Sequence, residues 1–130
     1  MAMQPASKVL SYSDLLVWQR SMDLVELAYR TSRTFPREEQ FGLTSQLRRA
    51  IVSVPSNIAE GHGRESLGEY LHHLSIANGS LMEFETQIAI SYRLGYLHGD
   101  GQARVLDLSK EVGRMLAGLT RALKARRRAS

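Results

Sequence analysis

The sequence predicts an all-α protein folded as an antiparallel up-and-down four-helix bundle, and three observations lead to this prediction. Apolar residues recur at steps of three and four over most of the 130 residues, and no alternating strand pattern is present. Prolines occur only at Pro5, Pro36 and Pro55. Short polar connections separate helices of about 20 to 28 residues, which favours antiparallel neighbours. Because 43% of the residues are hydrophobic, we expect one core and a single domain over residues 1–130.

The first helix is predicted at residues 13–34, after an N-terminal extension at residues 1–12. Ser13 or Asp14 can accept from the free amides at its start, and Phe35-Pro36 ends it. Its predicted apolar stripe consists of Leu15, Trp18, Met22, Val25 and Tyr29.

The second helix is predicted at residues 40–60. Its apolar side consists of Leu43, Leu47, Ala50, Ile51, Val54 and Ile58. Pro55 lies inside this helix, where it removes a backbone donor and crowds the carbonyl of Ile51, at a cost of about 3 kcal/mol. We therefore expect helix two to be kinked or broken at Pro55, and to stop at Gly61 or Gly63.

The third helix is predicted at residues 66–94, because Ser66 and Glu69 have the spacing of a capping box. Small residues at Ala77 and Gly79 predict a close approach by a neighbouring helix. The apolar seam of this helix consists of Leu67, Tyr70, Leu74, Ala77, Leu81, Phe84 and Ile88.

The fourth helix is predicted at residues 100–125, with Asp100 as a possible cap and a basic tail at residues 126–130. Its apolar stripe repeats the same rhythm with Val105, Leu108, Val112, Met115, Leu119 and Ala122.

The sequence carries no signature of an enzyme. It has no nucleophile elbow, phosphate-binding loop or dinucleotide-binding glycine pattern, and it has no cysteine. Glu69, His72 and His73 resemble half of a carboxylate-bridged metal site, but such a site needs matching pairs from two helices, so a surface ion pair is the better interpretation. We expect no catalytic residue, no metal and no cofactor.

Localisation is predicted from two negative features. No run approaches the roughly 20 apolar residues that span a bilayer, and the start lacks the apolar region of a signal peptide. We expect a cytoplasmic protein that does not enter the membrane.

The positive charge is concentrated at the C-terminal end. The formal net charge is +4, yet the tail holds five of the 17 basic residues and none of the 13 acidic ones, so residues 1–120 are nearly neutral. The tail could bind phosphates, or it could be a solubilising helix end favoured by the helix dipole, and the sequence leaves both alternatives open. Its basic residues are Arg121, Lys124, Arg126, Arg127 and Arg128.

A second polar set lies on the second helix. Arg48 and Arg49 precede Pro55, and Asn57 and Glu60 follow it. The favoured interpretation of this set is a structural polar motif that fixes helix register, and direct ligand contact is the alternative.

Several segments together resemble the 23S rRNA intervening-sequence protein family. They cover roughly residues 14–97 and include Leu16-Val17-Trp18-Gln19, Phe35-Pro36, Phe41-Gly42-Leu43, Gln46-Leu47-Arg48-Arg49-Ala50, Ser53-Val54-Pro55-Ser56-Asn57-Ile58-Ala59-Glu60-Gly61 and Leu94-Gly95-Tyr96.

The resemblance implies a bacterial four-helix-bundle protein, similar to the accessory protein of diversity-generating retroelements, whose relatives assemble into ring-like homopentamers. A basic surface of those relatives is thought to hold nucleic acid. The leading hypothesis is therefore a homo-oligomeric helper that binds RNA or DNA through Arg48, Arg49 and the five basic residues of the tail. The alternative is a protein-interaction scaffold whose partner is another protein.

Overall fold

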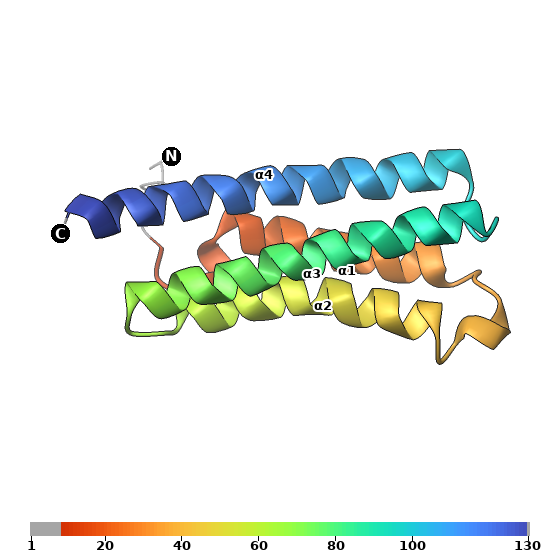
Figure 1. Ribbon diagram of the computed structural model, residues 1–130, viewed down its shortest axis with the longest axis horizontal. Coiled ribbons are helices and arrows are strands. Elements are labelled where there is room, and N and C mark those ends of the chain that lie inside the picture. Colours follow the sequence, from red (N-terminus) through yellow and green to blue (C-terminus); the bar gives the residue numbers. More distant parts are fainter. Residues whose placement is uncertain (1–8, 130) are drawn as a thin grey trace, which may run out of the picture.

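The computed structural model describes residues 9–129, and over this range its regular secondary structure is helical, without a strand. Figure 1 shows four long helices along the long axis of the molecule, with successive helices running in opposite directions. The prediction of an all-helical four-helix bundle is confirmed. The elements are η1 (Tyr12–Asp14), α1 (Leu16–Ser32), η2 (Arg37–Glu39), α2 (Leu43–His62), α3 (Leu67–Arg93) and α4 (Gly99–Ala129), where η denotes a short 3-10 helix.

Each long helix packs against two others. The most extensive contact joins α2 to α3, and the pairs α3–α4, α1–α2 and α1–α4 complete a four-sided bundle around one hydrophobic core. The large side chains at its centre have no measurable exposure, namely Leu24, Leu47, Ile51, Ile58, Leu81, Phe84 and Ile88. None of the helices within residues 9–129 is long and apolar enough to cross a membrane.

The apolar faces predicted for α2 and α3 are confirmed, since Leu47, Ile51 and Val54 on α2 and Leu74 and Phe84 on α3 are buried. The predicted stripe of α1 is only partly correct: Leu15, Trp18 and Val25 pack against the core, but they are not the most buried residues of this helix. The buried positions of α1 are Val17, Ser21, Leu24, Ala28 and Ser32, while Met22 and Tyr29 from the predicted stripe are each 38% exposed.

Serines explain the shifted face of α1. The hydroxyl of Ser21 donates to the carbonyl of Trp18 at 2.8 Å, and that of Ser32 donates to the carbonyl of Ala28 at 2.8 Å. A serine that bonds within its own helix carries no unpaired polar group into the core. The same shift occurs in α4, where Ser109 is buried and donates to a carboxylate oxygen of Glu85 at 2.5 Å.

The structure changes two predictions about α2. The helix is continuous across Pro55, so no interruption occurs there, while the kink stays a prediction. The helix also extends through Gly61 to His62 and is capped by Gly63, so of the two predicted stops Gly63 is confirmed and Gly61 is wrong. Gly61 is buried because α3 passes very close to it: a Cβ at this position would lie 2.8 Å from the Cβ of His73.

Helix α4 is longer than predicted and includes most of the basic tail. It ends at Ala129, so Arg126, Arg127 and Arg128 are helical and hold fixed positions relative to Arg121 and Lys124. The turn before α4 depends on Gly95, which has a φ of +80°, a conformation that other residues rarely adopt.

Candidate nucleic-acid interface

The predicted basic residues form two separate groups. Arg48 and Arg49 lie in the first half of α2, whereas the other five lie in the last turns of α4. The beginning of α2 and the end of α4 are at opposite ends of the bundle (Figure 1). The structure therefore does not join the two groups into one basic surface.

Arg48 is engaged inside the bundle. Its Nε donates to the hydroxyl of Ser32 at 2.9 Å, and its Nη2 donates to the carbonyl of Tyr29 at 3.3 Å. Its guanidinium also lies 4.5 Å from the centre of the Tyr29 ring, within range of a cation–π interaction. These contacts place a positive charge at the C-terminal end of α1, where the helix dipole favours it. Arg48 as a nucleic-acid contact stays a prediction.

Arg49 faces a different surface. It is exposed and lines a groove of about 470 Å³ between α2 and α3, together with Ser53, Ser80 and Glu83. Phe41 lies at this groove and is 90% exposed. Because Glu83 shares the groove, its charge is mixed, which makes it a weaker site for a polyanion.

The C-terminal half of α4 forms a second groove with the beginning of α3. Its volume is about 530 Å³, and Arg121 and Lys124 lie on its α4 side. The guanidinium of Arg127, one further step along α4, lies beside Gly68 at the start of α3. The groove is lined by Gly68, Leu71, His72, Leu74, Ser75, Asn78, Leu116, Ala117, Thr120, Arg121 and Lys124, and we call it the α3–α4 groove.

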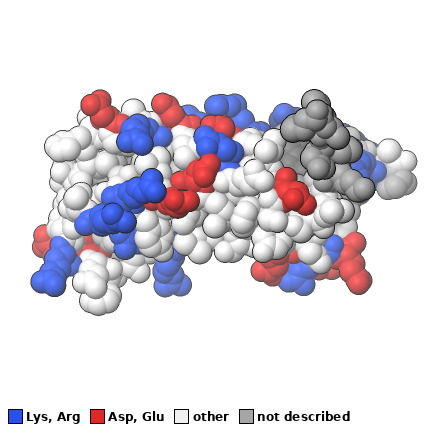
Figure 2. All heavy atoms as spheres, turned by 180° about the vertical axis from the view of Figure 1, so that it is seen from behind, with Lys and Arg blue, Asp and Glu red and all other residues white. Residues whose placement is uncertain are grey.

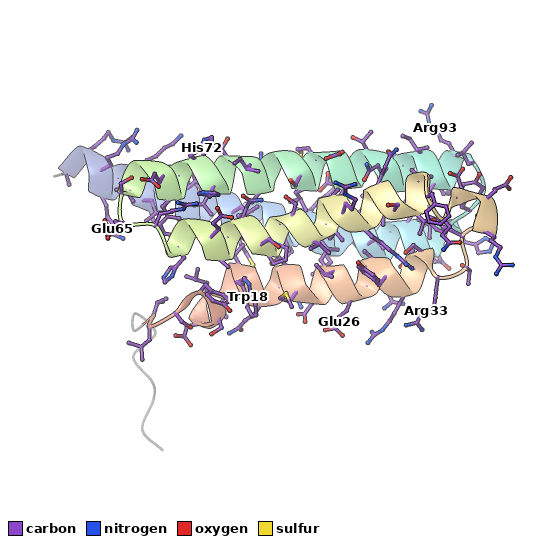
Figure 3. The ribbon with its side chains drawn as sticks, turned by 90° about the horizontal axis from the view of Figure 1, so that it is seen from below. Trp18, Glu26, Arg33, Glu65, His72 and Arg93 are labelled. Carbon is purple, nitrogen blue, oxygen red and sulfur yellow. The ribbon has the colours of Figure 1, made fainter. Side chains whose placement is uncertain are left out.

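No carboxylate lines the α3–α4 groove, which distinguishes it from other charged grooves of the molecule. Besides the α2–α3 groove with Glu83, a groove between α1 and α4 contains Asp107 and Glu111. His72 lies on α3 near the C-terminal end of α4 (Figure 3). The α3–α4 groove is therefore a local region of positive potential.

Three arginines elsewhere on the bundle, Arg20, Arg30 and Arg64, are paired with carboxylates. Arg20 bonds to Glu111 at 2.9 Å and to Asp23 at 2.6 Å, and the hydrogen bond from Arg20 lowers the pKa of Glu111. Figure 2 shows the resulting mixture of positive and negative side chains on one face of the bundle. Arg121 and Lys124 have no ion pair with any of residues 9–129, a property that they share with Arg49 and Arg104, so the lack of carboxylates around their groove is what sets them apart.

Arg126 and Arg128 likewise have no carboxylate partner within the described part of the chain. Burial raises the pKa of the Tyr70 hydroxyl, and the charge of nearby Arg126 partly offsets this rise. Tyr70 belongs to α3, so this interaction ties the last turns of α4 to the beginning of α3.

The predicted polar motif lies between α2 and α3. The Nδ2 of Asn57 donates to the carbonyl of Ser53 at 2.9 Å, and its Oδ1 lies 3.0 Å from Nδ1 of His73. Glu60 bonds to Arg64 at 2.6 Å and lies 3.6 Å from Nε2 of His73. The hydrogen bond from Arg64 and the charge of His73 lower the pKa of Glu60. These contacts support a structural role for Asn57 and Glu60, which stays a prediction.

The sequence did not indicate the residues that complete the polar motif of α2 and the α3–α4 groove. His73 was considered only as a metal ligand or surface ion pair, yet it is the α3 partner of Asn57. Ser75 and Thr120 carried no motif, but Ser75 follows His72 by three residues on the same side of α3, and Thr120 lines the α3–α4 groove from α4. Within residues 9–129, no cluster of three or more His, Asp or Glu side chains could hold a metal ion.

Comparisons with known proteins agree with this fold. A crystal structure of a protein with unknown function from the S23 ribosomal protein family of Bacteroides thetaiotaomicron is similar, with a TM-score of 0.74 and 20% sequence identity. The similarity covers 82% of this chain and 96% of that chain, and at this identity it shows the fold alone. A search of curated proteins found no match.

The profile of the family described as 23S rRNA-intervening sequence protein matches residues 13–118. This range contains the first three helices and most of α4, and it ends just before Arg121. The basic end of α4 is therefore an attribute of this chain that the family match does not cover. Over the greater part of its length, the chain belongs to the 23S rRNA-intervening sequence protein family.

Proposed function

We propose that this protein is a non-enzymatic, homo-oligomeric helper that binds nucleic acid through the basic end of α4. The observation that carries the proposal is the group of cationic side chains around the α3–α4 groove, which no carboxylate lines. Clustered cations such as Arg121 and Lys124 gain free energy when they release the counterions condensed on a polyanion. RNA is the preferred ligand because the family is described by its relation to rRNA. DNA binding is an alternative outcome of the same titration.

The absence of an enzymatic role belongs to the proposal. Polar side chains that the fold brings together, such as Asn57 and His73, are bonded to one another. Such mutual bonding favours a structural use over a catalytic one. The cysteine-free composition suits a reducing compartment, so we place this function in the cytoplasm.

Self-association is supported by an apolar face on α1 and α2. Tyr12, Trp18, Met22, Val52 and Pro55 border a shallow groove of about 420 Å³ in which no charged residue takes part. Figure 3 places Trp18 on α1 at the side next to α2. Apolar faces of this kind are typical of contacts between subunits. We propose that this face joins copies of the chain, with the pentamer implied by the family resemblance as the expected assembly.

Light scattering coupled to size-exclusion chromatography tests the assembly. The wild type should elute as an oligomer, and Met22→Glu should shift it toward the monomer, because a charge on the apolar face would be desolvated in the contact. Ala103→Glu, which adds the same charge at an exposed position on α4, should leave the mass unchanged. A monomeric wild type would contradict the proposal of self-association.

Salt-dependent RNA binding tests the nucleic-acid function. The logarithm of the association constant should fall linearly with the logarithm of salt concentration, by about 0.7 per neutralised phosphate of a single strand. Arg121→Gln together with Lys124→Gln should reduce this slope by about 1.4. The matched control is Arg33→Gln together with Arg37→Gln, which removes the same charge; Arg33 lies at the opposite end of the bundle from His72 (Figure 3). Absence of RNA and DNA binding at low salt would refute the proposed function.

The second candidate function is a scaffold that contacts only proteins. The uncharged α1–α2 face favours it, because such a face could equally receive a protein partner. A partner that stays bound after nuclease treatment, and is lost in Met22→Glu but retained in the Arg121/Lys124 double variant, would favour the scaffold.

A further inference from the structure

We infer that the α3–α4 groove is a nucleotide subsite that accepts one base of single-stranded RNA together with its phosphate. This inference rests on the proposed function, and it names the part of the RNA that the groove recognises. The groove combines an apolar base, hydrogen-bonding walls and a cationic edge, which together match the three chemical parts of a nucleotide.

The apolar surface of the groove comes from Leu71 of α3 and Ala117 of α4, while Leu74 and Leu116 lie beneath it as part of the core. The volume of about 530 Å³ lies within the range of about 300–1,000 Å³ typical of small-ligand sites. A phosphate alone would gain nothing from an apolar surface, whereas a base has faces that gain free energy when removed from water. The accessible apolar surface of Leu71 and Ala117 therefore indicates a ligand larger than an inorganic anion.

The walls carry polar side chains that the bundle leaves unused. Ser75 and Asn78 of α3 and Thr120 of α4 line the groove, and none of them bonds to another side chain within residues 9–129. Hydroxyl and amide groups can donate to and accept from the edge of a base or from the 2′-hydroxyl of ribose. Elsewhere in the bundle, comparable groups such as those of Ser53 and Asn57 bond to one another.

Arg121 and Lys124 line the α4 edge of the groove, and Arg127 continues their row beyond it. Arg121, Lys124 and Arg127 follow one another at steps of three residues, which is about 4.5 Å along the helix axis for each step. The same row passes the beginning of α3, where Gly68 has no side chain beside the guanidinium of Arg127. A strand whose backbone followed this row would present successive phosphates to successive cations.

The arrangement favours a single strand over a duplex. In a duplex the bases are stacked and paired, and a base must be extruded at a cost of about a few kcal/mol before it can enter a pocket. In a single strand the bases are free to turn toward the protein. The groove has no Phe, Tyr or Trp for stacking, so it should bind the base through shape and edge contacts.

The test uses a fluorescent single-stranded oligoadenylate and a variant that fills the groove without altering its charge. Ala117 lines the groove and is exposed, so Ala117→Phe should fold normally and obstruct it. We expect affinity to fall by about tenfold, the smaller end of the range for losing one bound base, with an unchanged salt slope. Ala103→Phe, an equal change at an exposed site on the same helix, should leave the affinity unchanged.

A second variant and a second probe make the result independent of one substitution. Ser75→Phe fills the groove from α3 and should reproduce the loss. Adenosine 5′-monophosphate should shift the backbone amide signals of Asn78 and Thr120 in NMR spectra of the wild type, but not of Ala117→Phe.

Wild-type affinity in both groove-filling variants would overturn the subsite while leaving the proposed function intact, since the basic row would then bind the backbone alone. Equal loss of binding to duplex RNA and to oligoadenylate would also overturn the preference for a single strand. Failure of the wild type to bind any nucleic acid would instead refute the proposed function.

Discussion

The close contact between Gly61 and α3 yields a prediction with an internal control. Alanine exceeds glycine in helix propensity by about 1 kcal/mol, so Gly→Ala inside an unobstructed helix is stabilising. Gly79, in the middle of α3, meets nothing within 4 Å of an added Cβ, so Gly79→Ala should raise the free energy of unfolding by about 1 kcal/mol.

Gly61→Ala should have the opposite effect. The added Cβ would lie 2.8 Å from the Cβ of His73, 3.1 Å from Cδ1 of Tyr70 and 3.2 Å from the Tyr70 carbonyl oxygen. The first and third of these atoms belong to the α3 framework and cannot rotate away, so α2 and α3 must separate. Overpacking of this kind costs about 1–3 kcal/mol, which exceeds or offsets the gain in helix propensity.

Urea unfolding followed by circular dichroism, at one protein concentration for all variants, measures the difference. The two alanine variants should differ by about 1–3 kcal/mol in free energy of unfolding, or by about 4–12 °C in midpoint temperature. If Gly61→Ala were as stable as Gly79→Ala, the close approach of α3 would not be the reason for glycine at position 61.

Three further predictions concern the polar contacts. Asn57→Ala should lower the free energy of unfolding, measured by urea titration, by about 1–3 kcal/mol, because it leaves His73 without its 3.0 Å partner. The control Asn78→Ala, at an exposed position, should change it by less than about 0.5 kcal/mol. Arg48→Met should lower the midpoint temperature by removing the bonds to Ser32 and Tyr29, and Arg48→Lys should not restore it, because an ammonium cannot reproduce the two separate contacts of the guanidinium. The pKa of Glu111 in the folded state lies below its ordinary value near 4.5, so the stability that Glu111 contributes is complete above that pH and is lost as the pH falls further. The free energy of unfolding, measured between neutral and acidic pH, should therefore decrease less steeply in Glu111→Gln than in the wild type. An identical pH profile would contradict the role of the Arg20–Glu111 pair.

Part of the candidate site was predictable from the chain. The clustering of Arg121, Lys124 and Arg126 near the C-terminus is visible as a run of basic residues, and helical spacing alone places Arg121 and Lys124 on one side of α4. The groove beside them was not predictable, because its other wall is α3, more than 40 residues earlier in the chain. Nothing in the sequence states that His72 and Ser75 face Arg121 across a gap between helices.

The two arginines of α2 were misleading when considered from the sequence alone. As neighbours in sequence, Arg48 and Arg49 formed one basic pair, yet adjacent residues on a helix point about 100° apart. One therefore faces α1 and bonds to Ser32, while the other faces the groove toward α3. Residue type indicated charge, but only the position of neighbouring helices decided how that charge is used.

The sequence by itself determined the all-helical class, the approximate extent of each helix and the buried faces of α2 and α3, because these follow from the local spacing of large apolar residues. Tertiary structure decided the rest. The buried face of α1 depends on Ser21 and Ser32 bonding within their own helix, and a neighbouring helix approaches closely at Gly61 but not at Gly79. Local periodicity cannot distinguish a small residue that faces a neighbouring helix from one that faces water, because that distinction depends on how the helices are rotated and set against one another.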